Sequence, residues 1–317
     1  MNSHSVLTSP AGSATALRIG MLCLLAHASA SVLSGVAFST FLAPPVPSWM
    51  STPENREIAT FLFRWGGQST VVLGALAGVL HAASRIGQRR AWLLFGVAFS
   101  ITLAAELLGT GTGYPFGPYT YTSQLGYLIA GLVPFNIPTS WFYMLYASLA
   151  ICGRLLPATD DGRTRWWWAL VAAVILTAWD VSMDPAMVRT NHWFWHVPQS
   201  TLNGSSLERF LGAPFYFGMP LTNWLGWLLT GFLVARVMLW LVPPSTWARD
   251  VAPSNVPLVL YAVNGVLPIA ICFSHDMALA GILGTIAMAV PLAAALLARL
   301  RAGASWARPV TASMRAG

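Results

Sequence analysis

The stretch Trp166–Met187, WWWALVAAVILTAWDVSMDPAM, carries the two features that decide the fold class. It opens as an apolar run of the kind that crosses a membrane. Near its end lie two aspartates, Asp180 and Asp184, separated by about one helical turn. Charged side chains are costly beside hydrocarbon and are kept there mostly for a function. The stretch therefore predicts a membrane-spanning helix that contributes acidic groups to a functional site.

The composition of the chain indicates the same class. Of its 317 residues, 56% are hydrophobic and 9% are charged, and several apolar runs are long enough to span a bilayer. The net charge of +7 comes from arginine, because the chain has no lysine, and the arginines form no tract of the kind that binds nucleic acid. Cys23, Cys152 and Cys272 lie in separate apolar runs, without the spacing of a disulfide framework or zinc site. We expect an all-α, polytopic membrane protein with no nucleic-acid partner.

About eight membrane spans are predicted from the apolar runs. They cover approximately residues 17–42, 59–83, 91–108, 140–156, 166–181, 221–242, 256–273 and 277–298. The predicted domains are a disordered tail over 1–16, one transmembrane domain over 17–300 and a cytoplasmic tail over 301–317. Between the third and fourth spans runs the uncharged segment 109–138, GTGTGYPFGPYTYTSQLGYLIAGLVPFNIP. Irregular backbone is tolerated at membrane depth only where protein or water satisfies its amides, so this segment predicts a re-entrant lid.

The arginines predict the orientation of the spans. With a cytoplasmic N-terminus, twelve arginines fall on the inner side, namely Arg18, Arg85, Arg89, Arg90, Arg154, Arg163, Arg165, Arg249, Arg299, Arg301, Arg308 and Arg315. Three fall on the outer side, namely Arg56, Arg189 and Arg209. Positive charge collects in cytoplasmic loops, so both termini are expected in the cytoplasm of a bacterial or archaeal cell.

This topology brings the polar intramembrane residues to one depth. Arg64 and Glu106 lie near the outer ends of the second and third spans, Asp180 and Asp184 at the outer end of the fifth, and Asn223 at the outer start of the sixth. Arg64 can neutralise one carboxylate in a structural ion pair, and Asp184, which precedes Pro185, can simply mark a helix end. Three acids against one arginine leave an excess, however, and that excess favours chemistry or ion coupling.

Other motifs carry less weight. His192 and His196 have the i,i+4 spacing of a metal pair, but the remaining histidines are scattered, and an interfacial aromatic belt explains HWFWH better. Gly109, Gly111 and Gly113 follow no strand and do not match a dinucleotide-binding fingerprint. The sequence therefore predicts no metal and no cofactor.

Several segments together resemble a known family. Glu106 with GTGTGYPFGPYTYT, then PTSWFYMLY, WDVSMDP and YFGMPLTNWLGW, occur in the order found in the integral-membrane carotenoid biosynthesis family of CruF type. The resemblance covers roughly residues 64–240. Members of this family are carotenoid 1',2'-hydratases, including bisanhydrobacterioruberin hydratase. The resemblance implies addition of water to the terminal isopropylidene double bond of an acyclic ψ end group, which gives a tertiary alcohol.

The acids and aromatics suit that chemistry. Hydration of an isolated alkene requires a positioned acid, an environment that tolerates a tertiary cation, and a water molecule activated by a base. We expect Asp180 to be the acid and Asp184 or Glu106 the base, with Arg64 keeping one carboxylate ionised. The residues expected to face the cation or bind the substrate are Tyr114, Tyr119, Tyr121, Trp179, Asn223 and Trp224.

The expected partners are a carotenoid of lycopene or γ-carotene type, water, membrane lipid and other carotenoid biosynthetic enzymes. Two other classes also account for part of the pattern. An ion-coupled transporter uses intramembrane acids, but the inverted repeat typical of such proteins is not visible. A non-catalytic carotenoid-binding protein needs the aromatics and not the acids.

Overall fold

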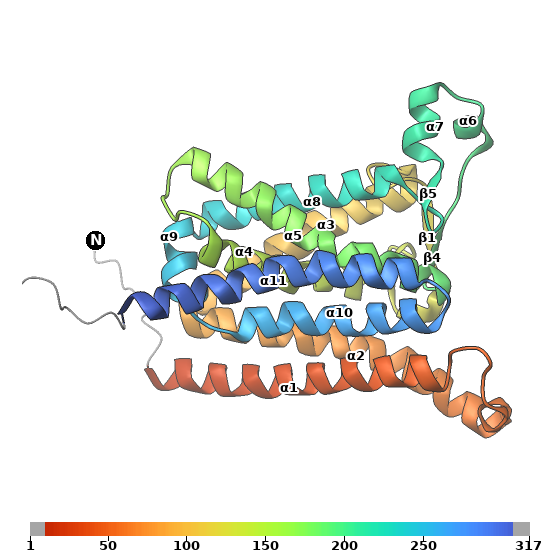
Figure 1. Cartoon of the computed structure of the whole chain (residues 1–317), viewed down its shortest axis with the longest axis horizontal. Coiled ribbons are helices and arrows are strands. Elements are labelled where there is room, and N and C mark those ends of the chain that lie inside the picture. The colour runs from red at the N-terminus through yellow and green to blue at the C-terminus, as the bar shows by residue number, and fades with distance from the viewer. Residues whose placement is uncertain (1–9, 307–317) are drawn as a thin grey trace, which may run out of the picture.

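The computed structural model describes residues 10–306, with side chains over 13–62 and 65–301. Eight long helices run in alternating directions (Figure 1). They are α1 (Pro10–Thr40), α2 (Pro53–Ile86), α3 (Gln88–Thr112), α4 (Asn136–Leu155), α5 (Gly162–Arg189), α8 (Leu221–Leu241), α10 (Val256–Ser274) and α11 (Ala278–Trp306). The all-α, polytopic class predicted from the apolar runs is thus confirmed.

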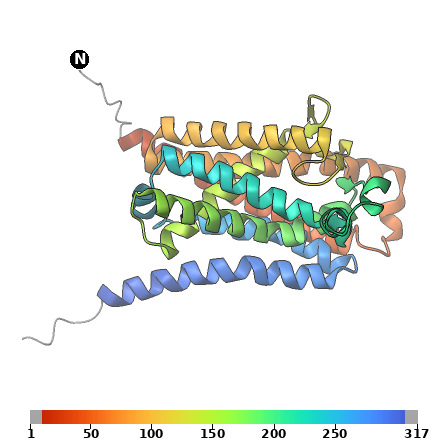
Figure 2. The same cartoon turned by 90° about the horizontal axis from the view of Figure 1, so that it is seen from above.

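Helix α4 is the centre of the bundle. It contacts α2, α3, α5 and α10, while α8 packs between α3 and α5. Helix α1 covers α2 and α10, and α11 lies along α10 and α5 at the side of the bundle (Figure 2). Every residue from Pro138 to Cys152 is buried, as expected for a helix that is apolar around its whole circumference.

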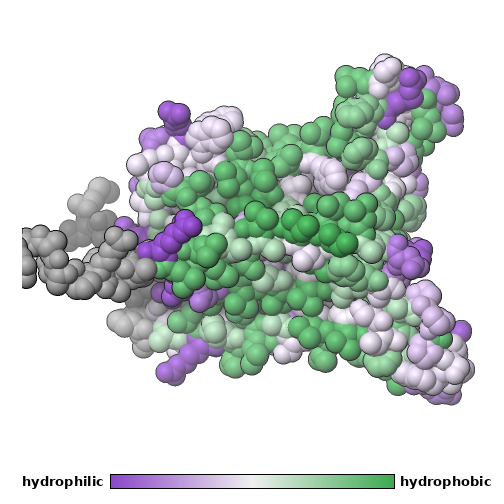
Figure 3. All heavy atoms as spheres, in the orientation of Figure 1, coloured by the Kyte–Doolittle hydropathy of each residue, from purple (hydrophilic) through white to green (hydrophobic). Residues whose placement is uncertain are grey.

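The other seven long helices are each long and apolar enough to cross a membrane. On the face shown in Figure 3, their outward sides form an apolar band across the middle of the molecule, with hydrophilic residues toward its two ends. The helix ends that carry Arg85, Arg89, Arg90 and Arg154 lie at the end of the molecule where α1 begins, opposite the end that carries the strands (Figure 1). This distribution is that of an integral membrane protein.

Short elements cap the strand-bearing end. Segment 113–135 forms β1 (Tyr119–Tyr121), η2 (Ser123–Leu125), β2 (Leu128–Ile129) and β3 (Val133–Pro134). Between α5 and α8 lie β4 (Trp193–Trp195), α6 (Gln199–Leu202), α7 (Ser206–Gly212), β5 (Pro214–Tyr216) and β6 (Met219–Pro220). Strand β1 pairs antiparallel with β4, β2 with β3, and β5 with β6. The predicted lid therefore forms part of a cap of short antiparallel strand pairs, which consists of segments 113–135 and 193–220.

The remaining short elements complete the chain. Turn η1 (Ser48–Ser51) joins α1 to α2, while α9 (Pro244–Thr246) and the π-helical turn η3 (Trp247–Val251) join α8 to α10 at the opposite end. Helix α1 begins at Pro10, inside the segment predicted as a disordered tail, and α11 continues to Trp306, past the predicted end of the transmembrane domain. Residues 1–9 and 307–317 lie outside the described residues.

Helix α5 extends beyond its predicted end. It continues through Pro185 to Arg189, so the interpretation of Asp184 as a helix end is wrong. A proline inside a helix removes the amide donor for the carbonyl four residues earlier, which here is that of Val181. The hydroxyl of Tyr216 donates to this carbonyl at 3.1 Å. The β5 strand thus supplies the hydrogen bond that Pro185 cannot make.

Candidate active site

Two aspartates of α5 meet one asparagine of α8. The Asn223 amide nitrogen lies 3.2 Å from Oδ2 of Asp180 and 2.5 Å from Oδ2 of Asp184, and it also contacts the Met219 sulfur at 2.7 Å. All three polar side chains are buried, and Oδ1 of Asp180 has no hydrogen-bond partner. The helical spacing of four residues places both carboxyls on the α5 face that packs on α8.

A third carboxyl is held by the cap. Glu106, near the end of α3, is buried and accepts hydrogen bonds at Oε2 from the hydroxyl groups of Tyr119 and Tyr121, the latter at 2.8 Å. Burial raises the pKa of both phenols, and the charge of Glu106 raises it further. Both tyrosines therefore remain hydrogen-bond donors to Glu106 at physiological pH.

The pairing of β1 with β4 explains which aromatics face the acids. Tyr119 lies opposite Trp195, and Tyr121 lies opposite Trp193. Because side chains alternate along a strand, these four rings share one face of the two-stranded sheet, while Thr120 and Phe194 share the other. The rings of Tyr121 and Trp193 are 5.7 Å apart in an edge-to-face arrangement. The alternation in YTY and WFW thus builds one aromatic wall.

Phe116 anchors the cap between two helices. A Cβ atom at Gly109 of α3 would lie 2.8 Å from the Phe116 ring, and one at Gly226 of α8 would lie 2.5 Å from it. Real Cβ contacts are not this short, so both positions must lack a side chain for the ring to enter. The glycines form a slot that fixes the cap over α3 and α8.

These groups enclose a chamber of about 50 Å³. This volume has room for at least one water molecule. Its polar wall consists of Glu106, Asp184 and Asn223 together with the two cap tyrosines. Its other walls are mainly aromatic, from Phe116, Trp141, Trp179, Trp193, Trp195 and Trp227. Asp180 does not line the chamber. It is connected to the chamber wall by Asn223, whose amide donates to both Asp180 and Asp184.

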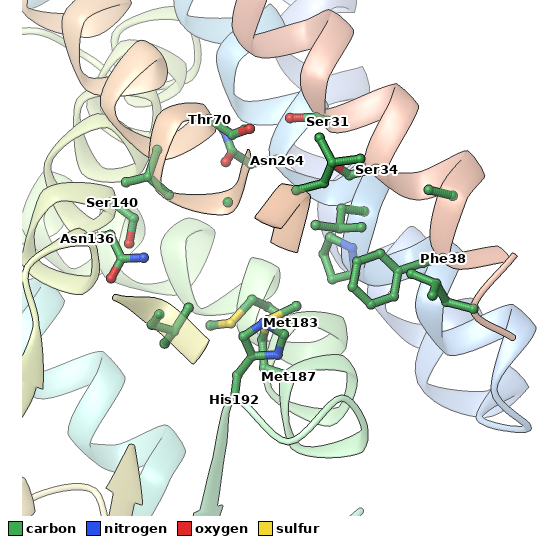
Figure 4. A pocket seen from close by; sticks show the side chains of 18 of the residues that line it. Ser31, Ser34, Phe38, Thr70, Asn136, Ser140, Met183, Met187, His192 and Asn264 are labelled. Carbon is green, nitrogen blue, oxygen red and sulfur yellow. The ribbon is translucent and has the colours of Figure 1, made fainter. Parts of the chain in front are cut away.

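A second, mostly apolar cavity of about 430 Å³ adjoins the chamber. Helices α1, α2, α4, α5 and α10 supply most of its walls (Figure 4). The two cavities share five lining residues, Ile137, Ser140, Trp179, Met183 and Trp193, which we call the neck. His192 lies on the wall of the larger cavity, and burial lowers its pKa to about 4, so the imidazole there is neutral.

Most of the polar residues predicted from the sequence are thus brought together. Glu106, Asp180, Asp184 and Asn223 form one buried group, and no cation among the described side chains pairs with its acids, since the one ion pair found there joins Arg249 to Asp250. The side chain of Arg64 lies outside the described residues, so its pairing with a carboxylate stays a prediction.

Two predicted aromatics do not belong to the chamber. Tyr114 is 75% exposed, because it follows the left-handed Gly113 that ends α3 and lies outside the cap. Trp224 does not line the chamber, since it lies about 100° around α8 from Asn223. It packs on Phe215 and Tyr216 of β5, and its indole lies beside Asp180. Tyr119, Tyr121 and Trp179 do line the chamber.

The sequence analysis missed other residues of the chamber. Trp193 is buried in the chamber wall, so the interpretation of HWFWH as an interfacial belt is wrong at this position. The matching alternation of YTY and WFW is the sequence signal that could have identified Trp193 as a chamber residue. Trp141 and Trp227, stacked with ring centroids 4.4 Å apart, lie on α4 and α8 and carry no such local signal.

Comparison with known proteins identifies the family of the chain. The model of a protein family described as "Carotenoid biosynthesis protein" matches residues 66–291, which include all five neck residues and every chamber residue. The chain belongs to this carotenoid biosynthesis family. No solved structure matches it.

A second comparison gives one similar protein. The chain is similar to a bisanhydrobacterioruberin hydratase of Haloarcula japonica, with 29% identity over 143 residues. The match covers 45% of this chain and 43% of the relative, which is less than half of either protein.

Proposed function

We propose that the chain is a hydratase that adds water to the terminal isopropylidene double bond of an acyclic carotenoid end group. The observation that carries this proposal is the junction of two unlike cavities, one acidic and one apolar, through a neck of five residues. Membership in a carotenoid biosynthesis family supports a carotenoid substrate, and the name of the similar haloarchaeal protein supports hydration.

The larger cavity suits one end of a polyene. Its volume of about 430 Å³ lies within the usual range of small-ligand pockets, and its walls are mostly apolar. An end group that enters this cavity comes to rest with its terminal double bond at the neck. There it meets Trp179 and Met183 and lies next to the acids of the chamber.

The geometry favours Asp184 as the proton donor that contacts the substrate. Asp184 lines the chamber, whereas Asp180 lies behind it, and both accept from the same Asn223 amide. Two buried carboxylates this close repel each other, so one proton retained by the pair relieves the repulsion. Asp180, the acid predicted from the sequence, then shares this proton with Asp184 and does not itself contact the substrate.

Glu106 suits the role of base. Tyr119 and Tyr121 both donate to Glu106, so its carboxyl group accepts both hydrogen bonds. An ionised carboxylate accepts in this way, and it can take a proton from water. The acid donates one proton to the alkene carbon, and the base removes one proton from the added water. The chamber therefore holds the same number of protons before and after the reaction.

The aromatic walls suit the cationic intermediate. Protonation of a trisubstituted alkene at its less substituted carbon leaves a tertiary cation. Trp179 lies edge-to-face with Trp227, with centroids 6.0 Å apart, and Trp227 stacks on Trp141. A π face that meets a cation contributes roughly 0.5–2 kcal/mol. The same walls restrict water to a small volume, which limits side reactions of the cation.

Conversion of a defined carotenoid tests the proposal. The purified chain, in detergent and with a metal chelator, is incubated with lycopene or γ-carotene without oxygen or nicotinamide. We expect a more polar product that is heavier by one water molecule, detected by chromatography and mass spectrometry. Carotenoid binding without a product would favour a binding protein, and carotenoid-independent ion flux in liposomes would favour a transporter.

A further inference from the structure

Asn136 is a buried polar residue on the wall of the larger cavity. It is the first residue of α4, its side chain is 3% exposed, and its Oδ1 has no hydrogen-bond partner. Buried amide groups are nearly always hydrogen-bonded, because an unpaired one loses its interaction with water without replacement. An amide can turn either its oxygen or its nitrogen toward a ligand. The wall at Asn136 thus offers a hydrogen bond to whatever fills the cavity.

Asn136 lies beside the neck. Ser140 follows it by one helical turn on the same face of α4 and lines both cavities. The Ser140 hydroxyl donates to the carbonyl of Ile137 at 2.8 Å, which leaves its oxygen free to accept. Asn136 and Ser140 lie close together, across the cavity from Met183, Met187 and His192 (Figure 4). They form a polar notch in a mostly apolar wall.

The notch and the acids lie on opposite sides of the neck. Glu106 and Asp184 line the chamber and not the larger cavity, whereas Asn136 lines the larger cavity and not the chamber. A double bond at the neck therefore has carboxyl groups on one side and the amide on the other. That arrangement suits hydration, because the proton donor and the water molecule can approach the double bond from different sides without competing for one position.

We infer that Asn136, with Ser140, holds the water molecule that adds to the cation. This inference rests on the proposed function. A chamber acid gives its proton to the less substituted alkene carbon, and the π electrons form the new C–H bond. The water oxygen then forms the C–O bond to the tertiary cation. The proposed base Glu106 takes the surplus proton of the added water, and the oxygen becomes the hydroxyl of the product.

An experiment in D2O distinguishes a residue that positions the water molecule from one that donates the proton. A cation that water does not capture returns a proton to the enzyme, so in D2O the unreacted end group gains deuterium. The substitution Asn136→Leu keeps similar volume and removes the hydrogen-bonding group. We expect its yield of hydrated carotenoid to fall about tenfold or more, because the nucleophile is no longer positioned. Deuterium uptake into recovered substrate should equal or exceed the wild-type rate, because a cation that is not captured by water returns to the alkene.

The control removes another orphaned polar atom. Thr222 has a buried hydroxyl oxygen without a partner but lines neither cavity, so Thr222→Val should leave hydration unchanged. Asn136→Ala serves as a second test variant if the leucine variant does not fold. Normal hydration by a folded Asn136 variant would overturn the inference, as would loss of hydration and deuterium uptake together. A wild-type chain that neither hydrates the carotenoid nor exchanges deuterium would instead refute the proposed function.

Discussion

At the level of single residues, the three buried acids differ in what they touch. Glu106 is held by two tyrosines of the cap, Asp184 lines the chamber beside Asn223, and Asp180 lies behind it. Their similar burial does not make them equivalent. A donor in contact with the substrate has to face the chamber, and a residue that acts through another does not.

Amide substitutions rank these roles. Asp184→Asn and Glu106→Gln remove a transferable proton and a base with little change in shape, so each should lower carotenoid conversion by about 10²–10⁴-fold. Asp180→Asn should cost less, because Asp184 still reaches the substrate. The measurement is the initial rate of product formation by purified variants, with equal amounts of folded protein verified by gel filtration.

Asp276→Asn is the matched control. This exposed aspartate lies in the turn between α10 and α11, where its backbone is left-handed, a conformation that asparagine also tolerates. It should convert carotenoid at the wild-type rate. If Asp180→Asn were inactive while Asp184→Asn kept normal conversion, the donor would be Asp180, as predicted from the sequence.

At the level of elements, the cap depends on two helices that come close to it. The Phe116 ring enters between Gly109 of α3 and Gly226 of α8, next to the pairing of β1 with β4. The same cap carries the tyrosines that hold Glu106. The position of the cap therefore controls both the closure of the chamber and the environment of one acid.

Adding a methyl group in this slot should displace the cap. In Gly226→Ala the new Cβ would meet the Phe116 ring at 2.5 Å and the Pro115 carbonyl carbon at 3.0 Å. Such overpacking costs typically about 1–3 kcal/mol of unfolding free energy. We expect a lower unfolding temperature in detergent and slower carotenoid conversion.

Gly96→Ala provides the comparison within a helix. Nothing lies within 4 Å of a Cβ at Gly96, so this change should be neutral or stabilise α3 by up to about 1 kcal/mol through helix propensity. If Gly226→Ala and Gly96→Ala had the same unfolding temperature and full carotenoid conversion, the Phe116 ring would not depend on a glycine at position 226.

At the level of the whole molecule, charge and chemistry occupy opposite ends. The chamber and cap lie at the end where α1 finishes, and the arginine-bearing helix ends at the junctions of α2 with α3 and of α4 with α5 lie at the other end (Figure 1). Because positive charge favours the cytoplasmic side, we expect the cap to face the outside of the cell, with both termini in the cytoplasm.

Cysteine labelling tests this orientation. In a background without Cys23, Cys152 and Cys272, a single cysteine replaces either Ser200 of the cap or Gly162 at the start of α5, both exposed positions. An impermeant thiol reagent on intact cells should label Ser200→Cys alone, and permeabilised cells should show labelling of both. Labelling of Gly162→Cys alone on intact cells would reverse the orientation and leave the chamber unchanged.

The sequence by itself determined the class of the fold and pointed to the buried acids of the candidate site. Apolar runs long enough for a bilayer can be read locally, and so can acids placed inside such runs, because both depend on the free energy of single segments in hydrocarbon. Glu106, Asp180, Asp184 and Asn223 were therefore found without coordinates. The eight long helices were found for the same reason.

The tertiary structure decided which residues surround those acids. Trp141, Trp227 and Met183 reach the chamber from separate helices, and their position depends on how each helix is rotated against its neighbours. No local pattern records that rotation in helices that are apolar on most sides. The order of the acids, with Asp184 in front and Asp180 behind, likewise follows from the packing of α5 on α8. The neck and the notch at Asn136 exist only because α4 lies at the centre of the bundle.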